Sequence, residues 1–75
     1  MAYELICPPK AETLATGFIG GAYKVYRGAK YCAELYPAGW NLTKDGERLR
    51  SWDDLPKAVQ KAALDAKRIL LSTTS

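Results

Sequence analysis

The longest hydrophobic pattern of the chain lies between Lys10 and Tyr36, where apolar side chains recur at every third or fourth position. The residues that share this spacing are Leu14, Phe18, Ala22, Val25, Ala29, Cys32 and Tyr36. Because an α-helix has about 3.6 residues per turn, this spacing brings the side chains onto one stripe. The pattern therefore predicts an amphipathic helix over residues 10–36, and Pro8-Pro9 fits its start.

Four glycines inside this segment argue against an uninterrupted helix. Gly17, Gly20, Gly21 and Gly28 each cost roughly 1 kcal/mol relative to alanine in a helix interior, or about 3–4 kcal/mol together. One way to offset this cost is to break the helix at Gly20-Gly21 into two shorter helices.

Two other arrangements also accommodate the glycines. In the first, another backbone packs closely on a narrow helical strip of Gly17, Gly21 and Gly28, either within the chain or in a homodimer. In the second, the segment is β-structure, with strands at Tyr23–Arg27 and Tyr31–Leu35 joined by the three residues Gly28-Ala29-Lys30. The sequence leaves these alternatives open.

Residues 39–51 predict a β-hairpin around Asp45-Gly46, because a type I′ turn needs positive φ at both central positions. The register that this turn imposes pairs Lys44 with Glu47, Thr43 with Arg48, Leu42 with Leu49 and Asn41 with Arg50. It places the apolar Trp40, Leu42 and Leu49 on one face, so the register set by the turn is the one that the hydrophobic pattern also favours.

A second helix is predicted over residues 54–71, where the carboxylates of Asp53 and Asp54 precede Pro56. Its apolar stripe contains Leu55, Val59, Ala62, Ala63, Ala66, Ile69 and Leu70. We therefore expect one small α+β domain over residues 1–75 in the order helix, β-hairpin, helix. Residues 1–9 form an extended arm in this scheme, and residues 72–75 a frayed tail.

The same order, with Lys44-Asp45-Gly46 at the hairpin turn, resembles the small lambda-type head-completion protein W family. The resemblance is limited to the layout and the hairpin residues, and the glycine-rich first helix departs from that family. It therefore implies no function for this chain.

The residue types argue against catalysis. The chain has no histidine, which removes the commonest general base and the commonest metal ligand. Cys7 and Cys32 without histidine do not match a zinc site, and the position of Cys32 on the apolar stripe predicts a reduced core thiol. Asp53 and Asp54 are explained as charges at a helix start. We expect no enzyme activity, no metal and no cofactor.

Composition and charge indicate the cellular compartment in which the protein resides. The formal net charge is +3, two cysteines do not form a disulfide framework, and neither a signal peptide nor a membrane-spanning run is evident. These features predict a cytoplasmic protein.

Two surfaces are candidates for binding a partner. The polar face of the first predicted helix carries Tyr23, Lys24, Arg27, Lys30 and Tyr31, and the outer part of the hairpin carries Arg48 and Arg50, followed by Trp52. Tyrosine, tryptophan and arginine are favoured anchors of protein interfaces. Basic side chains interleaved with aromatic ones also suit single-stranded nucleic acid.

The sequence-based hypothesis is a non-enzymatic protein that binds another macromolecule. Compact chains of this kind are typical of phage and mobile-element accessory proteins that inhibit or adapt a host protein complex. The alternative is a small nucleic-acid-binding regulator that uses Arg48 and Arg50 of the hairpin.

Overall fold

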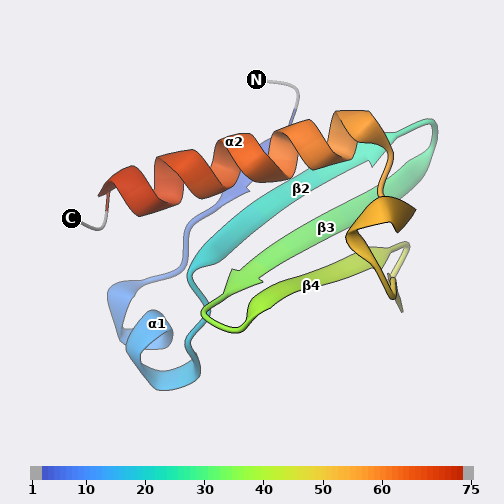
Figure 1. Cartoon of the computed structure of the whole chain (residues 1–75). Helices are drawn as coiled ribbons and strands as arrows, with labels where there is room; N and C mark the ends of the chain where they lie inside the picture. The colour runs from blue at the N-terminus through green and yellow to red at the C-terminus, as the bar shows by residue number, and fades with distance from the viewer. Residues whose placement is uncertain (1–2, 74–75) are drawn as a thin grey trace.

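The structure, a computed structural model, describes residues 3–73 as a five-stranded antiparallel sheet with a long helix across one face (Figure 1). The strands lie side by side in chain order: β1 (Glu4–Ile6), β2 (Gly20–Tyr26), β3 (Ala29–Tyr36), β4 (Gly39–Lys44) and β5 (Glu47–Arg48). The helices are α1 (Lys10–Thr16), the short 3-10 helix η1 (Trp52–Asp54) and α2 (Lys57–Thr73). The predicted α+β class is confirmed.

The predicted helix over residues 10–36 is wrong beyond its first seven residues. Gly17 ends α1 with φ of 80°, a left-handed conformation that glycine adopts without steric cost. The remainder forms β2 and β3, close to the strand alternative at Tyr23–Arg27 and Tyr31–Leu35. The helix-hairpin-helix layout, and with it the resemblance to the head-completion family, is therefore absent.

The turn between β2 and β3 contains two residues rather than the expected three. Tyr26 pairs with Ala29, and Arg27 and Gly28 between them have φ of 51° and 81°. Positive φ at both positions is what a type I′ turn requires. The Asp45-Gly46 turn has the same signature, with φ of 51° and 87°, and its predicted pairs Lys44–Glu47 and Thr43–Arg48 are confirmed.

Gly17, Gly21 and Gly28 do not form the predicted helix-packing strip, because only Gly17 adjoins a helix. Gly28 lies in a turn, and Gly21 is buried within β2. A Cβ atom at Gly21 would collide with the carbonyl oxygen of Ala33 and would lie 3.0 Å from Cα of Glu34. The backbone that approaches Gly21 closely is thus β3 of the same chain, and the described residues contain no helical glycine surface for a homodimer.

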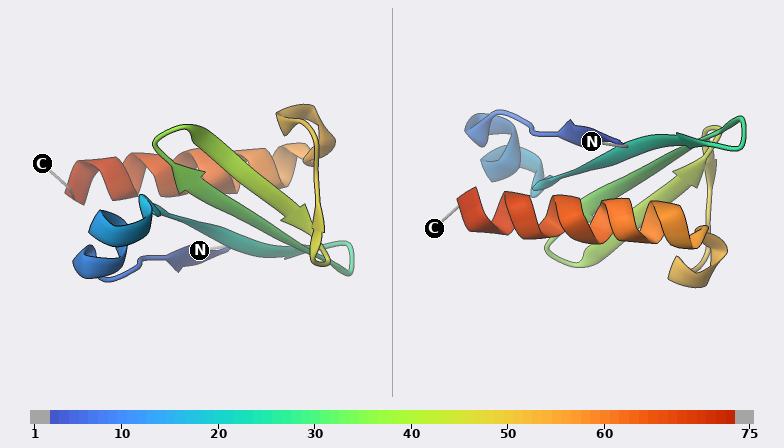
Figure 2. Two further views of the ribbon diagram at one scale, coloured as in Figure 1. Left: turned by 90° about the horizontal axis from the view of Figure 1, so that it is seen from below. Right: turned by 90° about the horizontal axis from the view of Figure 1, so that it is seen from above.

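The core lies between α2 and the face of the sheet that α2 covers (Figure 2). The predicted apolar stripe is confirmed: Val59, Ala62, Ala63, Ala66 and Leu70 of α2 are buried, as is Leu55 just before the helix, and Ile69 is half-buried. Opposite them lie Ala22, Tyr31, Ala33 and Leu42. Alanines on both sides allow the helix to approach the sheet closely.

The predicted extended arm is partly the edge strand β1, which Tyr3 ties to α2. The hydroxyl of Tyr3 donates to Oδ2 of Asp65 at 2.5 Å, and Nη2 of Arg68 donates to Oδ1 of the same carboxylate at 2.7 Å. The hydrogen bond between Tyr3 and Asp65 raises the pKa of the phenol and lowers the pKa of the carboxyl. Residues 72–73 of the predicted frayed tail instead belong to the last turn of α2, and residues 1–2 and 74–75 lie outside the described residues.

We expect Tyr3→Phe to lower the melting temperature by a few degrees at neutral pH, since it removes this hydrogen bond and keeps the ring. The depressed pKa of Asp65 means that its contribution is lost as pH falls through its folded pKa. The raised pKa of Tyr3 means that its contribution is lost as pH rises through its folded pKa. Thermal unfolding of both proteins across the pH range should therefore show a difference that shrinks at both extremes. A difference that stays constant with pH would contradict this account.

Candidate functional site

Trp40 and Trp52 form an aromatic pair at the outer edge of the sheet. Trp40 is the second residue of β4 and pairs with the buried Leu35, so its side chain lies on the α2 side of the sheet. Trp52 begins η1, and the ring centroids are 5.5 Å apart at an interplanar angle of 38°. Both rings are half-buried, which leaves part of each accessible to a partner.

Trp52 is held in place by hydrogen bonds on both sides of η1. The Ser51 side chain accepts from the Asp53 N–H, and the Asp54 carboxylate accepts from the Ser51 N–H, which together form a capping box. From α2, Nε2 of Gln60 donates to the carbonyl oxygens of Trp52 and Leu55, each at 3.1 Å. The aromatic pair is therefore pre-organised, which reduces the entropy lost on binding.

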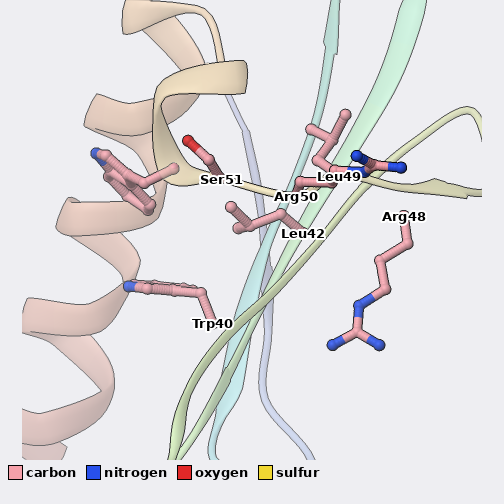
Figure 3. Close-up of a pocket in the computed structure, with 7 residues that line it drawn as sticks. Trp40, Leu42, Arg48, Leu49, Arg50 and Ser51 are labelled. Atoms are coloured by element: carbon pink, nitrogen blue, oxygen red, sulfur yellow. The ribbon is translucent and has the colours of Figure 1, made fainter.

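Two surface hollows meet at Trp40. The first has a volume of about 510 Å³ and is lined by Trp40, Leu42, Arg48, Leu49, Arg50, Ser51 and Trp52 (Figure 3). The second has a volume of about 400 Å³ and is lined by Tyr36, Ala38, Gly39, Trp40, Asn41 and Arg48. In Figure 3 the side chains of Trp40 and Arg48 point to opposite sides of β4. We call these two hollows, with the tryptophan pair, the Trp40–Trp52 site.

The Trp40–Trp52 site is cationic at its margin. Arg48 and Arg50 are exposed, and neither forms an ion pair within the described residues 3–73. An exposed arginine retains all its guanidinium donors for a carboxylate or phosphate of a partner.

The first surface predicted from the sequence is divided by the sheet. Successive residues of a strand point to opposite faces, so Tyr23 and Lys24 separate, as do Lys30 and Tyr31. Tyr31 is only 6% exposed and packs in the core, where Nζ of Lys44 lies 5.9 Å from its ring centroid. Tyr31 therefore does not present an anchor at the surface. Arg27 lies in the turn, over the ring of Tyr26.

Of the predicted residues, Tyr23, Lys30 and Arg48 lie on the face of the sheet opposite α2, whereas Lys24 shares the α2 side with its partner Tyr31. A row of paired positions crosses all five strands on the face opposite α2: Glu4, Tyr23, Cys32, Thr43 and Arg48. The predicted core position of Cys32 is wrong, because this thiol is half-buried on the uncovered face. Burial, with a smaller effect of the nearby Glu34 carboxylate, raises the pKa of the Cys32 thiol. A raised pKa disfavours the reactive thiolate.

Three of the predicted partner-binding residues, Arg48, Arg50 and Trp52, are brought together at the Trp40–Trp52 site. The sequence interpretation assigned Trp40 to the inner hairpin face and missed its contact with Trp52. The predicted register does not contain this signal, because alternation after Leu49 places Trp52 on the side opposite Leu49. The contact arises because the chain leaves the sheet after β5 and forms η1 at Trp52.

Within residues 3–73, no group of three histidine, cysteine, aspartate or glutamate side chains is arranged to hold a metal ion. No helix in that part of the chain has the length and apolar character needed to cross a membrane. Comparisons with protein-family models, with curated proteins and with solved structures gave no match.

Proposed function

We propose that the protein binds another protein through the Trp40–Trp52 site and has no catalytic activity of its own. The observation that carries this proposal is the pre-organised contact of two accessible tryptophan rings beside a 510 Å³ hollow. Tryptophan and arginine are the residue types that contribute most to binding energy at protein interfaces. In the cell, we propose that this binding inhibits or adapts a host protein complex, as an accessory protein of a phage or mobile element does in the cytoplasm.

The exposed arginines favour a partner segment with carboxylates. Arg48 lines both hollows and Arg50 lines the larger one, so the apolar surface of the tryptophans adjoins two positive charges. A segment with an aromatic or aliphatic anchor and neighbouring Asp or Glu complements this surface in shape and charge.

The nucleic-acid alternative is supported by the uncovered sheet face, where Arg48 lies beside Thr43 and near Asn41. These side chains are hydrogen-bonding groups of the kind that read bases or contact phosphates. The same face also carries Glu4 and Glu34, which repel phosphates. We therefore place a protein partner first.

A random 12-residue peptide library tests the proposal. We expect selection on the protein to enrich peptides that combine an apolar anchor with acidic residues. Trp52→Ala should weaken binding of a selected peptide by about 30-fold, the equivalent of 2 kcal/mol for an interface hot spot. Isothermal titration calorimetry measures the affinity, and circular dichroism checks that the variant is folded.

Two controls separate this surface from others. Leu14→Ala removes a 79% exposed apolar side chain on α1 that lines neither hollow, and should leave affinity unchanged. Tyr23→Ala/Arg27→Ala tests the surface first predicted from the sequence. Equal binding by wild type and Trp52→Ala would refute the proposal. Tight binding of an oligonucleotide, with affinity that falls steeply with salt and with Arg48→Ala, would support the alternative instead.

A further inference from the structure

The outer edge of β4 is only partly covered by its neighbouring strand. β4 runs over Gly39–Lys44, but β5 pairs only with Thr43 and Lys44. One further hydrogen bond, from the Leu49 N–H to the Leu42 carbonyl at 2.8 Å, extends this contact. The chain then leaves the sheet edge to form η1, so Gly39–Asn41 has no strand on its outer side within residues 3–73.

The direction of the backbone groups on β4 follows from the hairpin geometry. Tyr36 and Gly39 close a two-residue loop, so they exchange hydrogen bonds, and every second residue of β4 from Gly39 onward bonds to β3. The intervening residues point their N–H and C=O groups to the outer edge. The bond from Leu49 to the Leu42 carbonyl agrees with this alternation.

Trp40 is the outward-pointing residue that β5 does not reach. In the described part of the chain, no backbone group of another segment hydrogen-bonds to the N–H or C=O of Trp40 at this edge. An exposed pair of this kind is a template for main-chain pairing with an added strand.

The two hollows lie on either side of this free edge. The 510 Å³ hollow includes Trp40 and Leu42 on the α2 side, and the 400 Å³ hollow includes Gly39 and Asn41. Side chains of a β-strand alternate between the two faces of a sheet. Successive side chains of a strand added at Trp40 would therefore enter one hollow and then the other.

The charges select the occupant of the edge. Arg48 borders both hollows and Arg50 borders the larger, and neither has an ion-pair partner among the described residues. A second copy of this chain would bring its own arginines to the same edge, where like charges repel. An extended segment with Asp or Glu would instead form charge-assisted hydrogen bonds with them.

We infer that the free edge of β4 at Trp40 accepts an extended acidic segment of a protein partner as an added β-strand. This inference rests on the proposed function and specifies how the Trp40–Trp52 site is used. The main-chain groups of Trp40 bind the backbone of the segment, the hollows take its alternate side chains, and Arg48 and Arg50 bind its carboxylates.

Amide hydrogen exchange of the full chain, measured by NMR, tests the main-chain pairing. The probe is a 12-residue peptide selected from the random library described above. In the free protein we expect the Trp40 amide to exchange quickly and the neighbouring Asn41 amide, which bonds to β3, to exchange slowly. With the peptide at about 100 times its Kd, exchange of the Trp40 amide should slow by up to about 100-fold, because it then requires dissociation. Asn41 is the internal control and should not change.

N-methylation of single peptide bonds in the probe supplies a second measurement. Because alternate residues of an added strand face the protein, N-methylation should abolish binding at every second position in the paired stretch and be tolerated between them. Uniform tolerance would overturn the added strand.

The outcomes distinguish this inference from the proposed function. A peptide whose binding needs Trp52 but leaves the Trp40 amide in fast exchange overturns the added strand and leaves protein binding intact. Failure to select any peptide on wild type over Trp52→Ala overturns both. Selected peptides without acidic residues overturn the assigned partner chemistry. Protection of the Trp40 amide that rises with protein concentration alone means that a second copy occupies the edge, which also overturns the inference.

Discussion

Gly21→Ala is expected to lower the free energy of unfolding by about 3 kcal/mol, at the upper end of the range for forcing extra atoms into a packed region. The added methyl group would collide with the carbonyl oxygen of Ala33. Because this neighbour is backbone of a central strand, it cannot move without disturbing the ladder between β2 and β3. A domain of this size has about 5–10 kcal/mol in total, so the variant should lose roughly a third to a half of its stability.

Gly28→Ala is the matched control, since it makes the same chemical change in a different setting. A methyl group added at Gly28 would extend into open space, but the φ of this residue is 81°. The substitution therefore incurs only the left-handed backbone cost of about 1–2 kcal/mol. Urea unfolding followed by circular dichroism measures both variants. An equal loss at the two positions would contradict the close approach of β3 to Gly21.

The hairpin around Asp45-Gly46 and the helix α2 are predictable because local signals agree with packing. The turn residues set the register, and the register puts Leu42 and Leu49 on the α2 side with Trp40. In α2 the apolar spacing, the acidic start and Pro56 all favour a helix that begins near residue 54. Its main difference from the prediction is that residues 52–54 form the separate turn η1 before α2 begins at Lys57.

The segment 10–36 is misleading because a spacing of four residues satisfies both periods. Every fourth residue returns to one side of a helix and also to one face of a strand. Ala22 and Tyr26, and likewise Ala29 and Ala33, have this spacing and share the α2 side of the sheet. The glycines are the better guide, since their cost in a helix is visible from the sequence and disappears in a turn or a closely packed strand.

The candidate site is predictable only in part, because a helix and a strand place the same residues on different faces. Arg48 and Arg50 lie on the predicted hairpin, whose register the turn residues set, and Trp52 follows it directly, so their proximity is predictable from the sequence. Tyr31 is assigned to a surface because a helical projection places it opposite the apolar stripe. In β3 the alternation places it instead with Ala33 and Leu35 in the core. The free edge at Trp40 depends on where the chain leaves the sheet after β5, which local spacing does not specify.

Leu70→Ala is expected to destabilise the protein by about 3 kcal/mol, within the range for truncating a buried leucine. Leu70 is 2% exposed, and its two methyl carbons lie beside Gly20, at 2.8 Å from where a Cβ of that residue would be. Gly20 has no side chain to refill the cavity. A larger residue is not accommodated there, because its Cβ would lie 2.5 Å from the Ile6 carbonyl oxygen at a φ of 142°.

The neighbouring Leu71→Ala removes the same atoms from a position of α2 where the side chain is 47% exposed. It should change stability by about 0.5 kcal/mol or less, as surface substitutions usually do. The change in helix propensity is the same in both variants, so a difference between their melting temperatures reports the effect of burial alone. For a domain of this size, Leu70→Ala should lower the melting temperature by about 12–24 °C. Similar losses for both would mean that the end of α2 does not pack on β2 at Gly20, and the close approach inferred for that glycine would be wrong.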